Sequence, residues 1–332
     1  MIAPNRKLRW LIFAILLFFS FCIVSGIWIA DGTLHPPRRR LTEEESAHFH
    51  QAVSDLKGEL RDVSITVPDG SKLAGWLVKP SHPKGNAALL LHGLGDNRLG
   101  MTGYAEMLVA RGFIVLLPDA RAHGASGGTL ATFGLLERED IRSWTQFLAR
   151  EAGTRCVYGL GESMGAAQML QALGSGAEFC SVIAESPFSN FREIAYDRMG
   201  QPFHLGPWVG RTILRPIVEV AFLRARWKYG LDMERVAPED TVASAHVPVL
   251  LVHGQMDGNI PVRHSRRIHQ RDPKTVLWEV PGADHCGALA VAPNEFERWL
   301  VKWFPVSAPA GLAAGYLPSR KAARIDPIYT HD

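Results

Sequence analysis

One serine stands between two glycines in the stretch GESMG, residues 161–165. An apolar, β-branched run precedes this stretch and a helix-forming run follows it. A serine hydroxyl becomes a good nucleophile only when a base removes its proton, and that base is normally a histidine oriented by a carboxylate. Flanking glycines permit the sharp strand-to-helix turn that presents such a serine at the edge of a sheet. The pattern predicts a nucleophile elbow with Ser163 as the attacking residue.

The other two members of a catalytic triad follow later apolar runs. Asp257 comes just after the run VPVLLVHG, and His285 comes just after the run TVLWEVPG. The order Ser, Asp, His is the order in which this triad occurs on a parallel α/β sheet. We therefore predict that His285 is the general base and that Asp257 orients it. Glu185 ends an earlier apolar run and is the alternative acid. Glu162, beside the serine, is expected to be a solvated or loop-pairing carboxylate.

Apolar runs alternate with helix-forming runs along most of the chain, which predicts a mainly parallel sheet with helices on both faces. An alternating pair of strands around Pro68-Asp69-Gly70 predicts a hairpin before this unit. The apolar runs expected to form buried strands are residues 87–92, 113–119, 156–160, 180–186, 247–254 and 275–282. The helices expected between and after them are residues 101–112, 133–153, the segment after Ser163, and 293–304.

The alternation breaks over residues 187–242, a block too long for an ordinary loop. It is apolar and aromatic with spaced arginines, and we predict a helical cap inserted in the sheet domain. Residues from about Pro207 to Tyr229 can form a helix with one apolar face. That face either packs only on the core or also roofs the substrate pocket. In the second case Phe222 and Leu223 are expected to contact the acyl chain.

An uncharged apolar run, Trp10–Ala30, is long enough to cross a bilayer as one helix. A cleaved signal peptide is the alternative, with residues 24–26 as a small-residue site. The run continues through residues 27–29, which favours an anchor. The basic cluster at residues 6–9 favours a cytoplasmic N-terminus with the catalytic domain on the outer side. Deletion through Arg40 is expected to leave a soluble, active domain.

These features divide the chain into four parts. Residues 1–40 form the anchor and its basic flank, residues 41–60 a connector helix, and residues 61–304 the sheet domain with its cap. Residues 305–332, rich in Ala, Pro and Gly, are expected to be disordered.

Composition excludes several classes of protein. A net charge of +3 over 332 residues, without a basic stripe, argues against nucleic acid as a partner. Four cysteines do not make a disulfide framework in a chain of this length. We expect two of them, Cys156 and Cys180, to be small buried hydrophobic residues. The sequence has no metal-binding motif and no dinucleotide fingerprint, so neither a metal nor a cofactor is expected.

Three motifs together resemble one family. LLLHGLGDN (residues 89–97), LPDARAHGASGG (residues 117–128) and GESMG are similar to the α/β-hydrolase superfamily. The likeness spans residues 61–304 and is greatest to the capped branch with serine aminopeptidase-like, monoglyceride lipase-like and feruloyl esterase-like hydrolases. It implies the α/β-hydrolase fold and an oxyanion hole made by the backbone N–H groups of Leu94 and Met164.

Taken together, the residues and the resemblance predict a membrane-anchored serine hydrolase. It is expected to cleave an ester, thioester or amide of a largely apolar, lipid-like acyl compound through an acyl-serine intermediate. An acyltransferase or serine aminopeptidase with the same triad is the alternative from the same chemistry. A hydrolase fold used only as a binding module is the alternative without catalysis.

Overall fold

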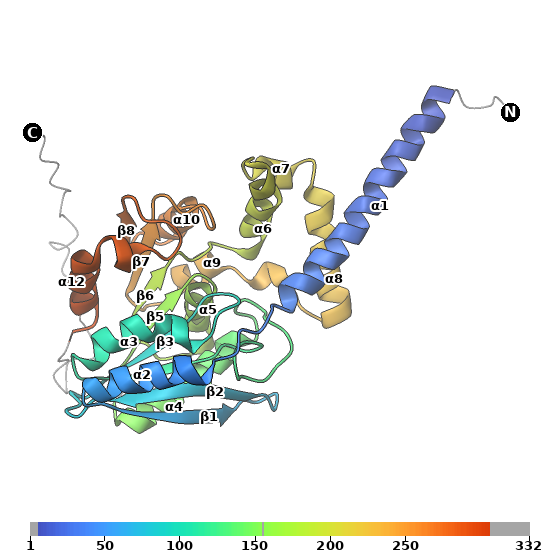
Figure 1. Ribbon diagram of the computed structural model, residues 1–332. Coiled ribbons are helices and arrows are strands. Elements are labelled where there is room, and N and C mark those ends of the chain that lie inside the picture. The colour runs from blue at the N-terminus through green and yellow to red at the C-terminus, as the bar shows by residue number, and fades with distance from the viewer. Residues whose placement is uncertain (1–5, 155, 306–332) are drawn as a thin grey trace, which may run out of the picture.

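A single eight-stranded sheet forms the centre of the computed structural model, which describes residues 6–154 and 156–305. Its strand order is β1-β2-β4-β3-β5-β6-β7-β8 (Figure 1). β2 pairs antiparallel with both β1 and β4, and the strands from β4 to β8 are parallel. The strands are β1 (Glu59–Thr66), β2 (Lys72–Lys79), β3 (Asn86–Leu91), β4 (Phe113–Pro118), β5 (Val157–Glu162), β6 (Ser181–Glu185), β7 (Val249–Gly254) and β8 (Val276–Val280).

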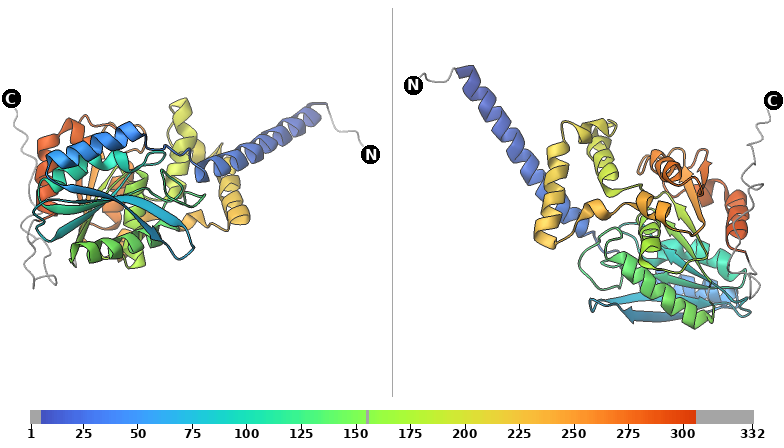
Figure 2. Two further views of the ribbon diagram at one scale, coloured as in Figure 1. Left: turned by 60° about the horizontal axis from the view of Figure 1, so that its bottom comes forward. Right: turned by 180° about the vertical axis from the view of Figure 1, so that it is seen from behind.

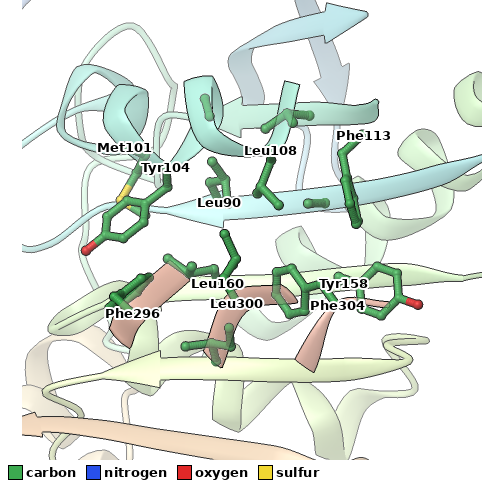
Figure 3. Close-up of a cluster of buried hydrophobic side chains, with 14 of the residues drawn as sticks. Leu90, Met101, Tyr104, Leu108, Phe113, Tyr158, Leu160, Phe296, Leu300 and Phe304 are labelled. Atoms are coloured by element: carbon green, nitrogen blue, oxygen red, sulfur yellow. The ribbon is translucent and has the colours of Figure 1, made fainter. Parts of the chain in front are cut away.

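Helices cover both faces of this sheet, which confirms the predicted α/β fold. One apolar cluster packs α2, α3 and α12 on one face, and a second packs α4, α5, α9 and α10 on the other. Figure 3 shows part of the first cluster, with the ring of Tyr104 at one end and its hydroxyl pointing out of the cluster. These helices are α2 (Glu43–Asp55), α3 (Thr102–Val109), α4 (Glu137–Ala152), α5 (Met164–Ala172), α9 (Pro238–Ser244), α10 (Arg263–Arg271) and α12 (Pro293–Trp303). The short α11 (Ala288–Val291) precedes α12.

The segment predicted as a connector helix, residues 41–60, contains α2, and this helix packs on the sheet. Thr42 caps α2 in a capping box with Glu45, which fixes where the helix begins. Phe49 and Val53 lie four residues apart on the inner side of the helix and are buried in the first cluster. The Phe49 ring stacks on that of Trp76, with ring centroids 5.2 Å apart.

The expectation for two cysteines is wrong. Cys156 and Cys180 form a disulfide, with Cα atoms 5.4 Å apart. They directly precede β5 and β6, which are neighbours in the sheet, and the amide of Cys180 donates to the carbonyl of Val157. The sheet register therefore brings the two thiols within bonding distance.

Between β6 and β7 the chain forms the cap: α6 (Phe191–Gly200), α7 (Trp208–Arg211) and α8 (Arg215–Tyr229). The N-terminal helix α1 (Arg6–Leu34) projects away from the sheet domain, and its last third lies beside α8 (Figures 1 and 2). By length and composition α1 can cross a membrane, and a signal sequence has the same properties. Apart from Pro305, the tail expected to be disordered, residues 305–332, lies outside the described residues.

Candidate active site

Ser163 lies at the corner between β5 and α5, as the sequence predicts. Its backbone has φ 53° and ψ −115°, a conformation that is strained for any residue except glycine. Both flanking residues must be glycine because other parts of the backbone approach them closely. A Cβ on Gly161 would lie 2.7 Å from the backbone of Gly165, and one on Gly165 would lie 2.6 Å from the carbonyl oxygen of His92. The sharp turn therefore depends on both glycines.

Three side chains from three loops meet at this corner. The hydroxyl oxygen of Ser163 lies 2.9 Å from Nε2 of His285. Nδ1 of the same ring lies 2.8 Å from Oδ2 of Asp257. The structure thus brings together the three residues that the sequence selected, in the relay expected of a nucleophile, a base and an orienting acid.

The carboxylate of Asp257 is held from several sides. Its Oδ1 accepts hydrogen bonds from the amides of Asn259 and Ile260 at 2.9 and 2.7 Å. Nε2 of His253 lies 3.3 Å from its Oδ2, a support that the sequence did not indicate. Burial by itself would raise the pKa of Asp257, but the contacts with His253, His285 and the Ile260 amide hold it well below its usual value. Asp257 is therefore ionised at neutral pH.

Glu185, the alternative acid, has other partners. One of its carboxylate oxygens accepts from the amide of Ala288 at 2.9 Å, and the other accepts from the hydroxyl of Tyr104 at the same distance. Its backbone carbonyl accepts from the amide of Ser163. Glu185 thus braces the loop after His285 and the nucleophile corner from behind, while Asp257 is the carboxylate in contact with the imidazole.

The two expected oxyanion donors border the same space. Met164 is the first residue of α5, so its amide belongs to the first turn, where N–H groups have no partner within the helix. Leu94 lies in the loop after β3, and both residues line the cavity in front of Ser163. Gly93 of that loop lies beside the nucleophile, and a Cβ there would make an ordinary contact, 3.5 Å, with Cβ of Ser163.

A cavity of about 730 Å³ opens in front of Ser163 and His285. Aromatic side chains of the cap region contribute to its lining, namely Phe188, Phe191 and Phe222. A second group of lining residues comes from the end of α1 and the segment after it, which the sequence did not predict. Within residues 6–154 and 156–305, no group of three or more His, Cys, Asp or Glu side chains is arranged to hold a metal ion.

Glu162 differs from the expectation of a solvated carboxylate. The hydroxyl of Tyr104 lies 2.6 Å from Oε1 of Glu162 and also 2.9 Å from Glu185. A phenol has one proton to donate, so both contacts are hydrogen bonds only when one carboxyl group is protonated. Burial raises the pKa of Glu162 to about 8, and the nearby Glu185 adds to the rise. Burial also raises the pKa of Glu185, so the two carboxyl groups together hold a proton at neutral pH.

This proton predicts a pH-dependent stability. In the unfolded chain a glutamate loses its proton near about pH 4.3, whereas folded Glu162 keeps it until about pH 8. Between these values the folded state binds the extra proton, so the free energy of unfolding falls as pH rises. We expect E162Q to lessen the drop in Tm between about pH 5 and pH 8 by about 2–4 °C. Thermal unfolding in detergent measures it, with the exposed Glu178→Gln as control. Equal pH slopes for E162Q and the unmodified protein would contradict the assignment.

Comparison with known proteins agrees with this arrangement. Residues 88–299 match the model of the alpha/beta hydrolase family. The chain is 29% identical to uncharacterized protein YqkD of Bacillus subtilis over 254 residues, which are 74% of this chain and 79% of that protein. It is 28% identical to uncharacterized protein YfhR of Escherichia coli, over 69% of this chain and 74% of that protein.

Solved structures show the same fold. The esterase Pf2001 of Pyrococcus furiosus is 25% identical and superposes with a TM-score of 0.62, over 81% of this chain and all of that chain. The esterase RhEst1 of a Rhodococcus species is 17% identical with a TM-score of 0.52, over 74% of this chain and 98% of that chain, and shares the fold. The chain therefore belongs to the alpha/beta hydrolase family, and its likeness to the esterase Pf2001 indicates a hydrolase.

Proposed function

We propose that this protein is a membrane-anchored serine hydrolase that cleaves an ester of a largely apolar acyl compound. The observation that carries the proposal is the contact chain from Ser163 through His285 to Asp257, which borders a cavity lined with aromatic side chains. A cavity of this size and lining suits a small apolar substrate.

The reaction follows from these positions. Nε2 of His285 takes the proton of Ser163 as the serine oxygen attacks the ester carbonyl. The amides of Leu94 and Met164 stabilise the resulting oxyanion. When the intermediate collapses, the alcohol leaves with the proton from His285, and the acyl group stays on Ser163. Water then gives its proton to His285 and attacks the acyl-serine, which releases the carboxylic acid and restores the serine.

Ester chain length tests this function. We expect kcat/KM for p-nitrophenyl esters to rise from acetyl to medium-chain acids. Each buried methylene can contribute up to about 0.8 kcal/mol, or roughly fourfold in kcat/KM. A flat profile would contradict an apolar acyl substrate, and no ester turnover at all would contradict the whole proposal.

The cap offers a matched pair of variants for the same assay. Phe222 lines the cavity, whereas the neighbouring Leu223 is 53% exposed and does not. The structure thus separates two residues that the sequence treated alike. Phe222→Ala should flatten the chain-length profile, and Leu223→Ala should leave its slope unchanged. If both variants had the same profile, Phe222 would have only a packing role.

We place the catalytic domain on the outer side of the membrane, with α1 as a retained anchor. The large apolar side chains of α1 from Leu8 to Phe21 are exposed, apart from the half-buried Phe18. A disulfide joins Cys156 to Cys180, and such bonds persist in oxidising compartments outside the cytosol. Both observations support this location.

Fractionation tests the location. The protein should stay with the membranes after an alkaline wash, with its N-terminus intact, and protease added from outside should degrade the catalytic domain. A soluble protein that begins near Ile27 would indicate a cleaved signal, and a protected, fully reduced domain would indicate the opposite orientation.

A further inference from the structure

One side of the C-terminal half of α1 is buried. Cys22, Gly26, Ala30 and Leu34 recur at intervals of four residues and are buried, which forms one stripe along the helix. Small side chains at this spacing let two helices approach closely, above all in membranes. α8 occupies the stripe: a Cβ on Gly26 would lie 2.7 Å from the carbonyl oxygen of Ile217. The anchor and the cap thus form one helix pair.

An ion pair fixes the register of this pair. Oδ1 of Asp31 accepts from Nε of Arg224 at 3.1 Å, and its Oδ2 accepts from Nη2 of the same guanidinium at 2.9 Å. The Lys228 amine and the Tyr229 hydroxyl also donate to this carboxylate, at 3.1 and 2.8 Å. A carboxylate gripped by two cations and a phenol holds the end of α1 on the cap.

The segment after α1 is fastened to the loops around the active site. The carbonyl of Leu34 accepts from the amide of Ala131 at 2.9 Å. Arg38 donates to the carbonyl of Ser126 at 2.6 Å, and Arg39 pairs with Asp96 at 2.6 Å. These contacts leave little freedom between the anchor and the sheet domain.

The end of α1 and the segment after it form a wall of the catalytic cavity. Seven residues of this stretch line the same cavity as Ser163 and His285, namely Ile29, Ala30, Gly32, Thr33, Leu34, Pro36 and Pro37. Deletion through Arg40 removes all of them. The sequence analysis expects this deletion to leave a soluble, active domain, and the structure adds that the deletion would open the cavity on one side.

The cap helix α8 lies beside the end of the apolar run of α1. Gly26 contacts Ile217 and Val220, whereas Asp31 contacts Arg224, so the two helices run parallel. Gly26 lies four residues inside the apolar run that ends at Ala30, or about 6 Å at the rise of an α-helix. The cap carries large apolar side chains that are more than half exposed: Trp208, Ile213, Leu223 and Trp227. Trp28 of α1, beside the cap, is also exposed, at 77%.

We propose that α1 and the cap together build the acyl pocket at the level of the outer leaflet, and that the substrate is an ester lipid of that membrane. The inference rests on the proposed hydrolase function and on α1 as an anchor. The membrane is the partner that matches the exposed apolar side chains, because they lie next to the span that crosses it. A lipid acyl chain then reaches Ser163 along the α1 wall without passing through water.

A matched pair of substitutions on α1 tests the wall. Ala30 lines the cavity, whereas Val24, on the same helix, is 68% exposed and does not. Full-length protein in detergent is assayed with acetyl and decanoyl p-nitrophenyl esters. We expect Ala30→Phe to lower the ratio of decanoyl to acetyl kcat/KM by about tenfold, the effect of roughly two buried methylenes. Val24→Phe should leave the ratio within about twofold of the unmodified protein.

A second variant, which adds no bulk, keeps the test valid if Ala30→Phe does not fold. Asp31→Asn weakens the ion pair with Arg224 without adding bulk, and it should lower the same ratio by about threefold or more. An unchanged ratio in Asp31→Asn and in any folded Ala30→Phe, or an equal fall in Val24→Phe, overturns the wall. A flat profile in the unmodified protein would instead count against the proposed function.

Vesicles test the source of the substrate. Unmodified full-length protein is reconstituted in phosphatidylcholine vesicles, and a fluorogenic diacyl lipid ester is placed either in the same vesicles or in separate ones. Two chains keep this probe from exchanging through water. We expect hydrolysis to be at least about tenfold faster in the same vesicles, while p-nitrophenyl acetate is hydrolysed equally in both mixtures. Equal lipid hydrolysis in both mixtures, or none in either alongside normal acetate turnover, would overturn the membrane as the source.

Discussion

Ser163→Ala is expected to lower ester turnover by roughly 10³-fold or more. The hydroxyl of Ser163 lies 2.9 Å from Nε2 of His285, at a corner whose backbone has φ 53°. Alanine keeps this corner and removes the oxygen atom that forms the acyl bond in the proposed mechanism. A residual rate above that in water should remain, because the oxyanion donors and the cavity still act on the bound ester.

Labelling with a fluorophosphonate and ester kinetics measure this loss. Ser186 provides a matched control, since it also has a positive φ, 51°, and follows the neighbouring strand β6. Its hydroxyl accepts from the amide of Cys286 rather than contacting the imidazole. Ser186→Ala should stay labelled and lose less than about tenfold in kcat. If Ser163→Ala kept activity within tenfold, the assignment of the nucleophile would be wrong.

The sheet was predictable because a strand that is buried on both faces is a continuous apolar run, which can be recognised in the sequence of that strand alone. β3 and β4 are continuous apolar runs, and both are buried along their whole length. The order of Ser163, Asp257 and His285 carries similar local information, since each follows a predicted strand. Parallel strands place these loops at one edge of the sheet, where the structure brings the three side chains together.

Contacts between distant segments were not predictable in the same way. The pairing of Cys156 with Cys180 depends on β5 and β6 being neighbours, which no single stretch of sequence states. The proton held between Glu162 and Glu185, at the ends of β5 and β6, depends on Tyr104, which comes from helix α3. For α1, the signal was present as Cys22, Gly26 and Ala30 at equal spacing. The sequence did not reveal that α8 would fill that stripe.

Asp257→Asn is expected to lower kcat by about 10³–10⁴-fold. Oδ1 of Asp257 accepts from two backbone amides, so an asparagine in this place would keep its carbonyl oxygen on them. Its NH₂ group would then face Nδ1 of His285, where Oδ2 now lies at 2.8 Å. An NH₂ group can only donate, so Nδ1 must become the acceptor and the imidazole must hold its proton on Nε2. In that tautomer Nε2 cannot accept the proton of Ser163.

Glu185→Gln is the control, because it also replaces a carboxylate by its amide, and Glu185 contacts the loop after His285. Its oxygens contact Tyr104 and the amide of Ala288, so a glutamine can keep an acceptor toward one of them. We expect less than about tenfold loss in kcat and a larger effect on Tm, because the imidazole keeps Asp257 as its partner. Single-turnover acylation separates the two variants from effects on product release. The reverse ranking, with Glu185→Gln inactive and Asp257→Asn active, would move the orienting acid to the end of β6. His285 would then have to turn away from the loop after β7 to reach it.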